Sequence, residues 1–217
     1  ASPPDALPVN AAQLTTVMTE SFEDQEGFER ILAARRRNAV LLGPGNGVTD
    51  ATRARVLTAL RDDAACVLDA DALTVFEGRG AELFGSINGW CVMTPHDGEF
   101  TRLFGESPAE QGKVSTAKDA ARECGAVVLL KGADTVIAAP DGRVSINSNA
   151  PPDLASAGTG DVLSGLVVGL LAQGMDPFDA ACAACWVHGA SGALVGPGLI
   201  AEDLPEAIPP ILRQLRR

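Results

Sequence analysis

The sequence has 217 residues, of which 46% are hydrophobic and 21% charged, a composition typical of a folded globular chain rather than a disordered one. The formal net charge of −11 opposes contact with a phosphate backbone, so we expect no nucleic-acid partner. The longest apolar run is short and interrupted by glycine, which predicts no membrane partner. The length favours a single domain over residues 1–217.

The five cysteines predict packed thiols rather than a metal or redox centre. Only the spacing CAAC indicates such chemistry, and it lies in the alanine-rich run DAACAACWVHGASGAL without a second Cys/His pair. We therefore expect reduced core thiols, and we expect His188 in the same run to pack rather than react. The odd number of cysteines and the lack of a secretory segment predict a cytoplasmic protein.

Along the first 125 residues, short apolar runs alternate with helical patterns, which predicts a mainly parallel sheet covered by helices. Strands are expected within 38–47, 65–73 and 90–100, the last stopped by Pro95. The pattern TDATRARVLTAL predicts a helix over 49–60. VSTAKDAARECG predicts a second helix, with Gly125 as its C-terminal cap.

The pattern changes after residue 125. AVVLLKGADTVIAAPDGRVSIN predicts a strand, a short connection and a β-hairpin within 126–148, because PDGR is a favourable turn. Two helices rich in small residues are expected over 161–173 and 177–194. We expect Gly165 and Gly169 to lie where these helices meet, so that Gly169→Leu would cost about 1–3 kcal/mol.

Four polar clusters follow apolar strands: GPGNG, DADA, TPHDGE and KGADT. In open parallel sheets, ligands bind outside the carboxyl ends of the strands. The four clusters therefore predict one binding site rather than four separate loops.

The stretch SAGTGDVLSG predicts an anion site at the start of a helix. Gly158 and Gly160 permit positive φ, so successive N–H groups can converge on an anion, and the helix dipole adds positive charge. Asp161 should remain ionised there and can accept a proton from a substrate hydroxyl. The alternative is that Thr159 or Asp161 only caps the helix.

Other polar residues allow two interpretations each. Lys131, at a strand end, fits a point charge on phosphate or a solvated hairpin lysine. His96 fits a ligand contact or a hydrogen-bonded structural histidine. Asp69 and Asp71 alternate on the expected strand and so face the same side, where they could hold Mg²⁺ through water or cap the next helix. Glu99 is a third carboxylate of the same kind.

These motifs resemble a known family. SAGTGDVLSGLVVGLLAQG looks like the anion-hole and catalytic-base motif of ribokinase-like enzymes. Together with GPGNG, VLDADAL, TPHDGEF and KGADTVIAAPDG in this order, it is similar to the ADP/ATP-dependent NAD(P)H-hydrate dehydratases. These enzymes form the carboxyl-terminal half of many bifunctional NAD(P)HX-repair proteins. The resemblance covers nearly the whole chain and implies a ribokinase-like three-layer sandwich.

The resemblance also implies residue roles. Asp161 would be the general base and a substrate contact, and Gly45, Gly47 and His96 would hold the hydrated nicotinamide nucleotide. The implied nucleotide contacts are Lys131, Gly132, Ala133, Asp134, Thr135 and Gly160, and the implied anion hole is Ala157, Gly158, Thr159 and Gly160. The family further implies Mg²⁺, ADP or ATP as co-substrate, NAD(P)HX as substrate, a homotetramer, and an NAD(P)HX epimerase domain fused to or paired with this one.

Two other functions remain open: a small-molecule kinase for a vitamin-precursor alcohol, and a non-catalytic nucleotide-binding subunit. Members of the family open with a strand, a glycine-rich turn and a helix before the segment resembling ASPPDALPVNAAQL. We therefore expect the sheet to be incomplete beside residues 38–43. Either a further segment completes it, or the polypeptide is a shortened form with weak or no dehydratase activity.

Overall fold

The computed structural model describes residues 1–14, 16–34 and 36–215. Its sheet has six strands in the order of the sequence: β1 (Ala39–Leu42), β2 (Ala65–Leu68), β3 (Cys91–Met93), β4 (Val127–Leu130), β5 (Thr135–Ala138) and β6 (Val144–Asn147). Strands β1 to β4 are parallel, and β5 and β6 continue the sheet antiparallel. The mainly parallel sheet and the hairpin within 126–148 are thus confirmed.

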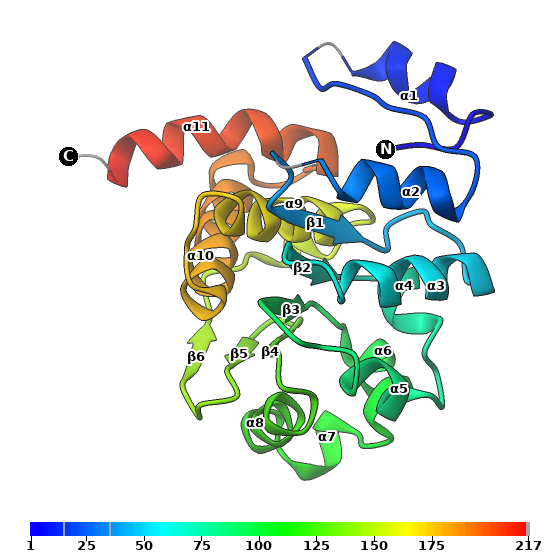
Figure 1. Ribbon diagram of the computed structural model, residues 1–217. Coiled ribbons are helices and arrows are strands. Elements are labelled where there is room, and N and C mark those ends of the chain that lie inside the picture. The colour runs from blue at the N-terminus through cyan, green and yellow to red at the C-terminus, as the bar shows by residue number, and fades with distance from the viewer. Residues whose placement is uncertain (15, 35, 216–217) are drawn as a thin grey trace.

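Helices cover both faces of the sheet, as Figure 1 shows. The α-helices are α1 (Leu7–Gln13), α2 (Gln25–Leu32), α3 (Asp50–Ala59), α4 (Asp71–Thr74), α5 (Gly80–Phe84), α6 (Asp97–Phe104), α7 (Pro108–Gln111), α8 (Lys113–Cys124), α9 (Thr159–Leu171), α10 (Pro177–Val195) and α11 (Leu204–Leu215). Two 3₁₀ turns, η1 (Pro152–Leu154) and η2 (Ala201–Asp203), precede α9 and α11. The predicted helix ending at Gly125 is confirmed, since Gly125 has the left-handed conformation of a C-cap.

On one face, α9 and α10 pack against alternate strand residues such as Val67 of β2, Val92 of β3 and Leu129 of β4. The expected pair of helices is therefore confirmed, but the expected contact is wrong. Gly165 and Gly169 are exposed, and a Cβ atom on either would meet nothing within 4 Å among the described residues. A helix rich in small residues allows a neighbouring helix to pack closely against it. The composition does not predict which face of the helix makes that contact.

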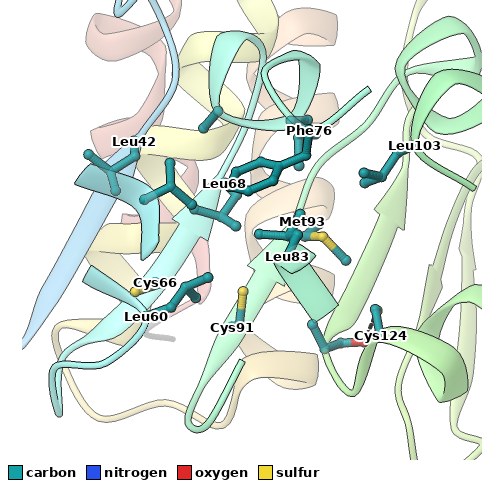
Figure 2. Close-up of a cluster of buried hydrophobic side chains, with 14 of the residues drawn as sticks. Leu42, Leu60, Cys66, Leu68, Phe76, Leu83, Cys91, Met93, Leu103 and Cys124 are labelled. Atoms are coloured by element: carbon teal, nitrogen blue, oxygen red, sulfur yellow. Dashed lines mark hydrogen bonds between the residues drawn. The ribbon is translucent and has the colours of Figure 1, made fainter. Parts of the chain in front are cut away.

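The other face packs against helices α2 to α6 and α8, and Figure 2 shows part of this core. The next residues of the same strands point here, including Leu68 and Met93, because successive side chains of a strand alternate between faces. Cys66, Cys91 and Cys124 lie among them as free, buried thiols, and burial raises the pKa of Cys66 and Cys124 to about 12. The prediction of packed thiols is confirmed for this cluster.

Helix α10 corrects one expectation about the membrane. It is 19 residues long and is the one helix among the described residues that is long and apolar enough to cross a membrane by length and composition. Half of its apolar window is buried inside the protein, where it packs against α9, α11 and the sheet. A core helix passes the same test, so α10 is explained by its place under the sheet.

Strand β1 lies at the edge of the described sheet and pairs with β2 alone among the described strands. Its side chains are nevertheless covered from both sides, because Leu41 packs towards α9 and Val40 and Leu42 pack towards the opposite core. The prediction that a further segment completes the sheet beside residues 38–43 stays a prediction.

Candidate active site

Lys131 joins the carboxyl ends of the central strands. Its Nζ lies 2.8 Å from Asp69 Oδ1, which follows β2, and 3.9 Å from Glu99 Oε2, which lies in α6 after β3. The same Nζ would lie 3.4 Å from a Cβ atom built on Gly160, at the start of α9. Lys131 is therefore not a solvated hairpin lysine. It is held at the point where three of the predicted motifs meet.

The turn after β2 differs from the expected strand. The strand ends at Leu68, and Ala70 has a φ of 48°, which turns the chain into α4 at Asp71. Asp69 and Asp71 consequently do not face the same side. Asp69 is 1% exposed and its Oδ1 accepts from Lys131 and from the N–H of Ala70 (2.9 Å), whereas Asp71 Oδ2 accepts from the N–H of Gly47 (2.7 Å). Neither carboxylate caps α4.

The loop GPGNG follows β1 and is tied to this turn. Gly45 and Gly47 have φ of 68° and 75°, and a Cβ atom on Gly45 would meet nothing within 4 Å among the described residues, so the loop presents open backbone. Gly43 is different, because a Cβ atom there would lie 1.6 Å from the carbonyl oxygen of Asp69. The contact of Gly47 with Asp71 brings the two predicted substrate glycines to the same strand ends.

His96 caps helix α6. Its Nδ1 accepts from the N–H of Gly98 (2.9 Å) and Glu99 (3.3 Å), and Glu99 Oε2 accepts in return from the N–H of His96 (2.9 Å). The structural alternative is thus realised for Nδ1. The imidazole remains half exposed, with Nε2 lying 3.5 Å from Glu99 Oε1, so contact with a substrate stays a prediction.

At the start of α9, one backbone N–H group lacks a carbonyl acceptor among the described residues. Gly158 has a φ of 83° as predicted, whereas Gly160 is helical, so only one of the two glycines uses positive φ. The N-cap residue is Gly158, and neither the Thr159 nor the Asp161 side chain caps the helix. The Thr159 hydroxyl instead contacts the carbonyl oxygens of Leu154 (2.7 Å) and Ser156 (2.9 Å). Among the described residues, no carbonyl accepts from the N–H of Gly160.

Asp161 follows Gly160 and faces the charged group around Lys131. Partial burial raises the pKa of Asp161 above its ordinary value, and the negative charge of Asp69 raises it further, while Lys131 acts in the opposite direction. An anion-binding N-terminus would act in the opposite direction, and the expectation that Asp161 stays ionised remains a prediction. A raised pKa makes the carboxylate a stronger base, which suits proton abstraction.

A cavity of about 740 Å³ lies beside these residues. It extends from His96 and Lys131 past the start of α9 to the buried side of α10, and most of its wall is apolar. The predicted residues that line it are His96, Lys131, Gly132, Ala133, Thr135, Thr159 and Gly160. This volume is in the range of pockets that hold small ligands.

Lys113 and Asp134 shape the loop between β4 and β5. Lys113 Nζ lies 3.3 Å from the carbonyl oxygen of Lys131 and 3.3 Å from Asp134 Oδ1, and the hydrogen bond from Lys113 lowers the pKa of Asp134. The Asp134 side chain is therefore turned to Lys113, and Asp134 is not part of the cavity wall. A Cβ atom on Gly132 would lie 2.2 Å from Lys113 Nζ, so a side chain at residue 132 would displace the end of this lysine.

A family model for NAD(P)H-hydrate dehydratase matches residues 1–209. The chain belongs to this family. The bifunctional NAD(P)H-hydrate repair enzyme Nnr of Salinibacter ruber is 45% identical over 183 residues, which are 82% of this chain and 34% of that protein. The chain thus spans about a third of that relative's length. The match disfavours the interpretations as a vitamin-precursor kinase and as a non-catalytic subunit.

Solved structures agree with this assignment. The ADP/ATP-dependent NAD(P)H-hydrate dehydratase of Bacillus subtilis, co-crystallised with ATP/Mg²⁺ and soaked with CoA, has a TM-score of 0.77 and 30% identity, covering 97% of this chain and 77% of that one. A ribokinase-like superfamily protein from Enterococcus faecalis has a TM-score of 0.76 at 23% identity, covering 87% and 68%. The latter likeness concerns the fold alone, and it confirms the ribokinase-like architecture.

Sequence reasoning for this NAD(P)H-hydrate dehydratase family member missed two residues and misjudged a third. Gly43 was visible as the first glycine after a strand but was passed over for Gly45 and Gly47. Lys113 carried no local signal, because it stands 18 residues before the lysine whose carbonyl it contacts. His188 is buried as predicted, yet it also lines the cavity and contacts the start of α9.

Proposed function

We propose that this protein dehydrates hydrated NADH and NADPH at the expense of ADP or ATP. The observation that carries the proposal is the meeting of four of the five sequence motifs at Lys131, beside a cavity large enough for a nucleotide. The structurally similar protein from Bacillus subtilis is named for this activity, which supports the choice of substrate.

In the proposed reaction, Asp161 accepts the proton of the nicotinamide-ring hydroxyl while the hydroxyl oxygen takes the terminal phosphoryl group of the nucleotide. The ring carbon–oxygen bond then breaks, phosphate leaves, and loss of a neighbouring ring proton restores the double bond. With ADP the products are NAD(P)H, AMP and phosphate. The raised pKa of Asp161 favours the first proton transfer.

Lys131 and the amide groups at the start of α9 would stabilise the phosphoryl charge. An ammonium acts as a point charge on phosphate, and an N–H without an internal partner can donate to it at no cost to the fold. The apolar wall of the cavity, including Leu154 and Leu163, would limit the access of water to the phosphate.

The residues also fit Mg²⁺ held through water. Asp69 Oδ2 is a buried carboxylate oxygen without a hydrogen-bond partner in the described part of the chain, and Glu99 provides a second carboxylate nearby. The described residues contain no group of three metal-binding side chains, so the nucleotide phosphates would supply the remaining ligands. Asp71 is turned to Gly47 and is a poor candidate. When bound, Mg²⁺ would offset negative charge on the phosphates.

Nucleotide dependence provides the test of this function. The protein is incubated with NADHX, Mg²⁺ and either ADP, ATP or no nucleotide, and the absorbance of NADH is followed. Restoration of NADH only with a nucleotide is expected, together with release of one phosphate per NADH. A parallel incubation with a thiazole or pyrimidine alcohol and ATP should give no phosphorylated alcohol. The reverse pattern would replace this proposal with a kinase.

Three further features belong to the proposal. We place the protein in the cytoplasm, where its nicotinamide substrates and reduced thiols would coexist. We infer a homotetramer from the resemblance, which light scattering on the purified protein tests. The resemblance implies a link to an NAD(P)HX epimerase domain, the name of the bifunctional relative from Salinibacter ruber is consistent with a second domain, and residues 1–217 would then act as the dehydratase domain.

A further inference from the structure

His188 is a buried histidine on α10 that the proposed reaction does not use. It is 7% exposed, and its Nε2 lies 2.9 Å from the carbonyl oxygen of Thr159, the first residue of α9. A carbonyl oxygen only accepts, so Nε2 carries the hydrogen and donates it. Burial lowers the pKa of His188, although the bond to Thr159 opposes this effect, and the neutral ring then has an unprotonated Nδ1.

The hydrogen bond from His188 ends on the peptide group that joins Thr159 to Gly160. The carbonyl of Thr159 and the N–H of Gly160 belong to the same planar, trans peptide group, so fixing one fixes the direction of the other. The N–H groups of Thr159 and Asp161 have acceptors within the chain, at Ser156 (3.4 Å) and Gly158 (3.1 Å), whereas no described carbonyl accepts from Gly160. Hydrogen bonding to the carbonyl also polarises the peptide group and strengthens its N–H as a donor.

The Gly160 N–H group lies close to the positive charge of Lys131. Lys131 Nζ would lie only 3.4 Å from a Cβ atom on Gly160, and Gly160, Thr159, Lys131 and His188 all line the same cavity. An anion next to Lys131 would therefore also lie next to Gly160.

We propose that His188 is a positioning residue that holds the Thr159–Gly160 peptide group, through the Thr159 carbonyl, so that the Gly160 N–H is directed at the phosphoryl group of the nucleotide. This inference rests on the proposed nucleotide-dependent function. It assigns a role to a histidine that the sequence suggested was only packing.

The test compares two amide substitutions. His188→Gln can place its amide nitrogen near the position of Nε2 and keep the bond, whereas the shorter side chain of His188→Asn cannot. Affinities for ADP and for adenosine, which lacks phosphate, are measured by calorimetry. We expect His188→Asn to weaken ADP binding about fivefold, the usual effect of one hydrogen bond, with adenosine binding unchanged and His188→Gln near the unsubstituted protein. Turnover of NADHX should fall with ADP affinity while its KM stays unchanged.

Ser191→Ala is the matched control, because Ser191 is fully buried one turn along α10 and its hydroxyl has no partner among the described residues. Equal losses for ADP and adenosine, or equal losses in the Gln and Asn variants, would overturn the proposal. If His188→Asn does not fold, the amide proton resonance of Gly160 in the unsubstituted protein decides. It should move downfield with ADP and not with adenosine, and an unchanged resonance rejects the proposal. Because nucleotide affinity is measured without NADHX, these outcomes are separate from failure of the dehydration assay.

Discussion

Replacing Gly43 by alanine should damage the fold and the site together. Gly43 directly follows β1 and has a φ of 132°, a backbone conformation that residues with a side chain rarely adopt. A Cβ atom there would lie 1.6 Å from the carbonyl oxygen and 2.6 Å from the carbonyl carbon of Asp69. Both atoms belong to the backbone, so no side-chain rotation can relieve the overlap. The turn after β2 must move instead, and it carries the carboxylate that holds Lys131.

Two costs add in Gly43→Ala. The unfavourable φ costs about 1–3 kcal/mol, and overpacking that displaces backbone costs about 1–3 kcal/mol more. The sum is about 2–6 kcal/mol, which is a large part of the typical stability of a domain. Gly45→Ala is the matched control, because its φ of 68° carries strain but its Cβ atom would meet nothing within 4 Å among the described residues. It should lose only about 1–2 kcal/mol.

Urea unfolding followed by circular dichroism measures both variants against the unsubstituted protein. The expected order of stability is unsubstituted protein, Gly45→Ala and then Gly43→Ala. ADP affinity, measured under conditions where each variant is folded, should fall in Gly43→Ala because displacement of Asp69 releases Lys131. If the two alanine variants unfolded at the same urea concentration, the overlap with Asp69 would not exist in solution and the assigned turn would be wrong.

Further changes separate the roles of the remaining residues. Asp161→Asn removes the base and should lower turnover about 100-fold with ADP affinity nearly unchanged, and normal turnover would leave Asp161 without a catalytic role. Lys131→Ala should weaken ADP binding about tenfold in calorimetry, with adenosine as the control. Because partial burial and Asp69 raise the pKa of Asp161 while Lys131 lowers it, activity should be lost as pH falls through a value above 3.8. In Lys131→Met this acid limb of kcat/KM should move to higher pH, and movement to lower pH would contradict the assignment. In thermal melting, Gly169→Leu should leave stability nearly unchanged, whereas Gly189→Ala, whose Cβ atom would lie 1.9 Å from the Asn149 side chain, should cost about 1–3 kcal/mol.

The elements that sequence predicted correctly are those with strong local signals. The apolar runs of β1 to β6 and the glycine cap at Gly125 fix the type and order of the elements, and parallel strands place their polar carboxyl ends at one edge. The failed prediction that Asp69 and Asp71 face the same side has a non-local cause. A non-glycine residue, Ala70, takes positive φ there because Gly43 and Lys131 hold the turn, and neither neighbour is close in sequence.

Contacts between distant segments could not be predicted. Gly189 is crowded and Gly169 is not because Asn149 packs against Gly189. Both glycines lie in helices rich in small residues, so the local sequence does not distinguish them. The bond from His188 to Thr159 likewise depends on how α10 crosses α9. A histidine in an alanine-rich helix predicts only that its imidazole has a hydrogen-bond partner, because a buried imidazole rarely lacks one. It does not predict which residue that partner is.

The charges around Lys131 place a condition on any nucleotide that binds there. One ammonium group faces the carboxylates of Asp69 and Glu99, and Asp161 adds a third negative charge nearby. The ammonium group of Lys113, which reaches this loop from α8, is already paired with Asp134. A diphosphate would therefore enter a site whose own charges do not balance it, in a chain of net charge −11. The start of α9 contributes only about half a positive charge. A divalent cation brought in with the phosphates, as proposed above, would offset this imbalance, and Asp69 Oδ2, which has no hydrogen-bond partner among the described residues, could face it. The same reasoning favours the proposed use of oriented amides for the anion, because an N–H group would donate to phosphate without adding a positive charge beside the proposed base Asp161.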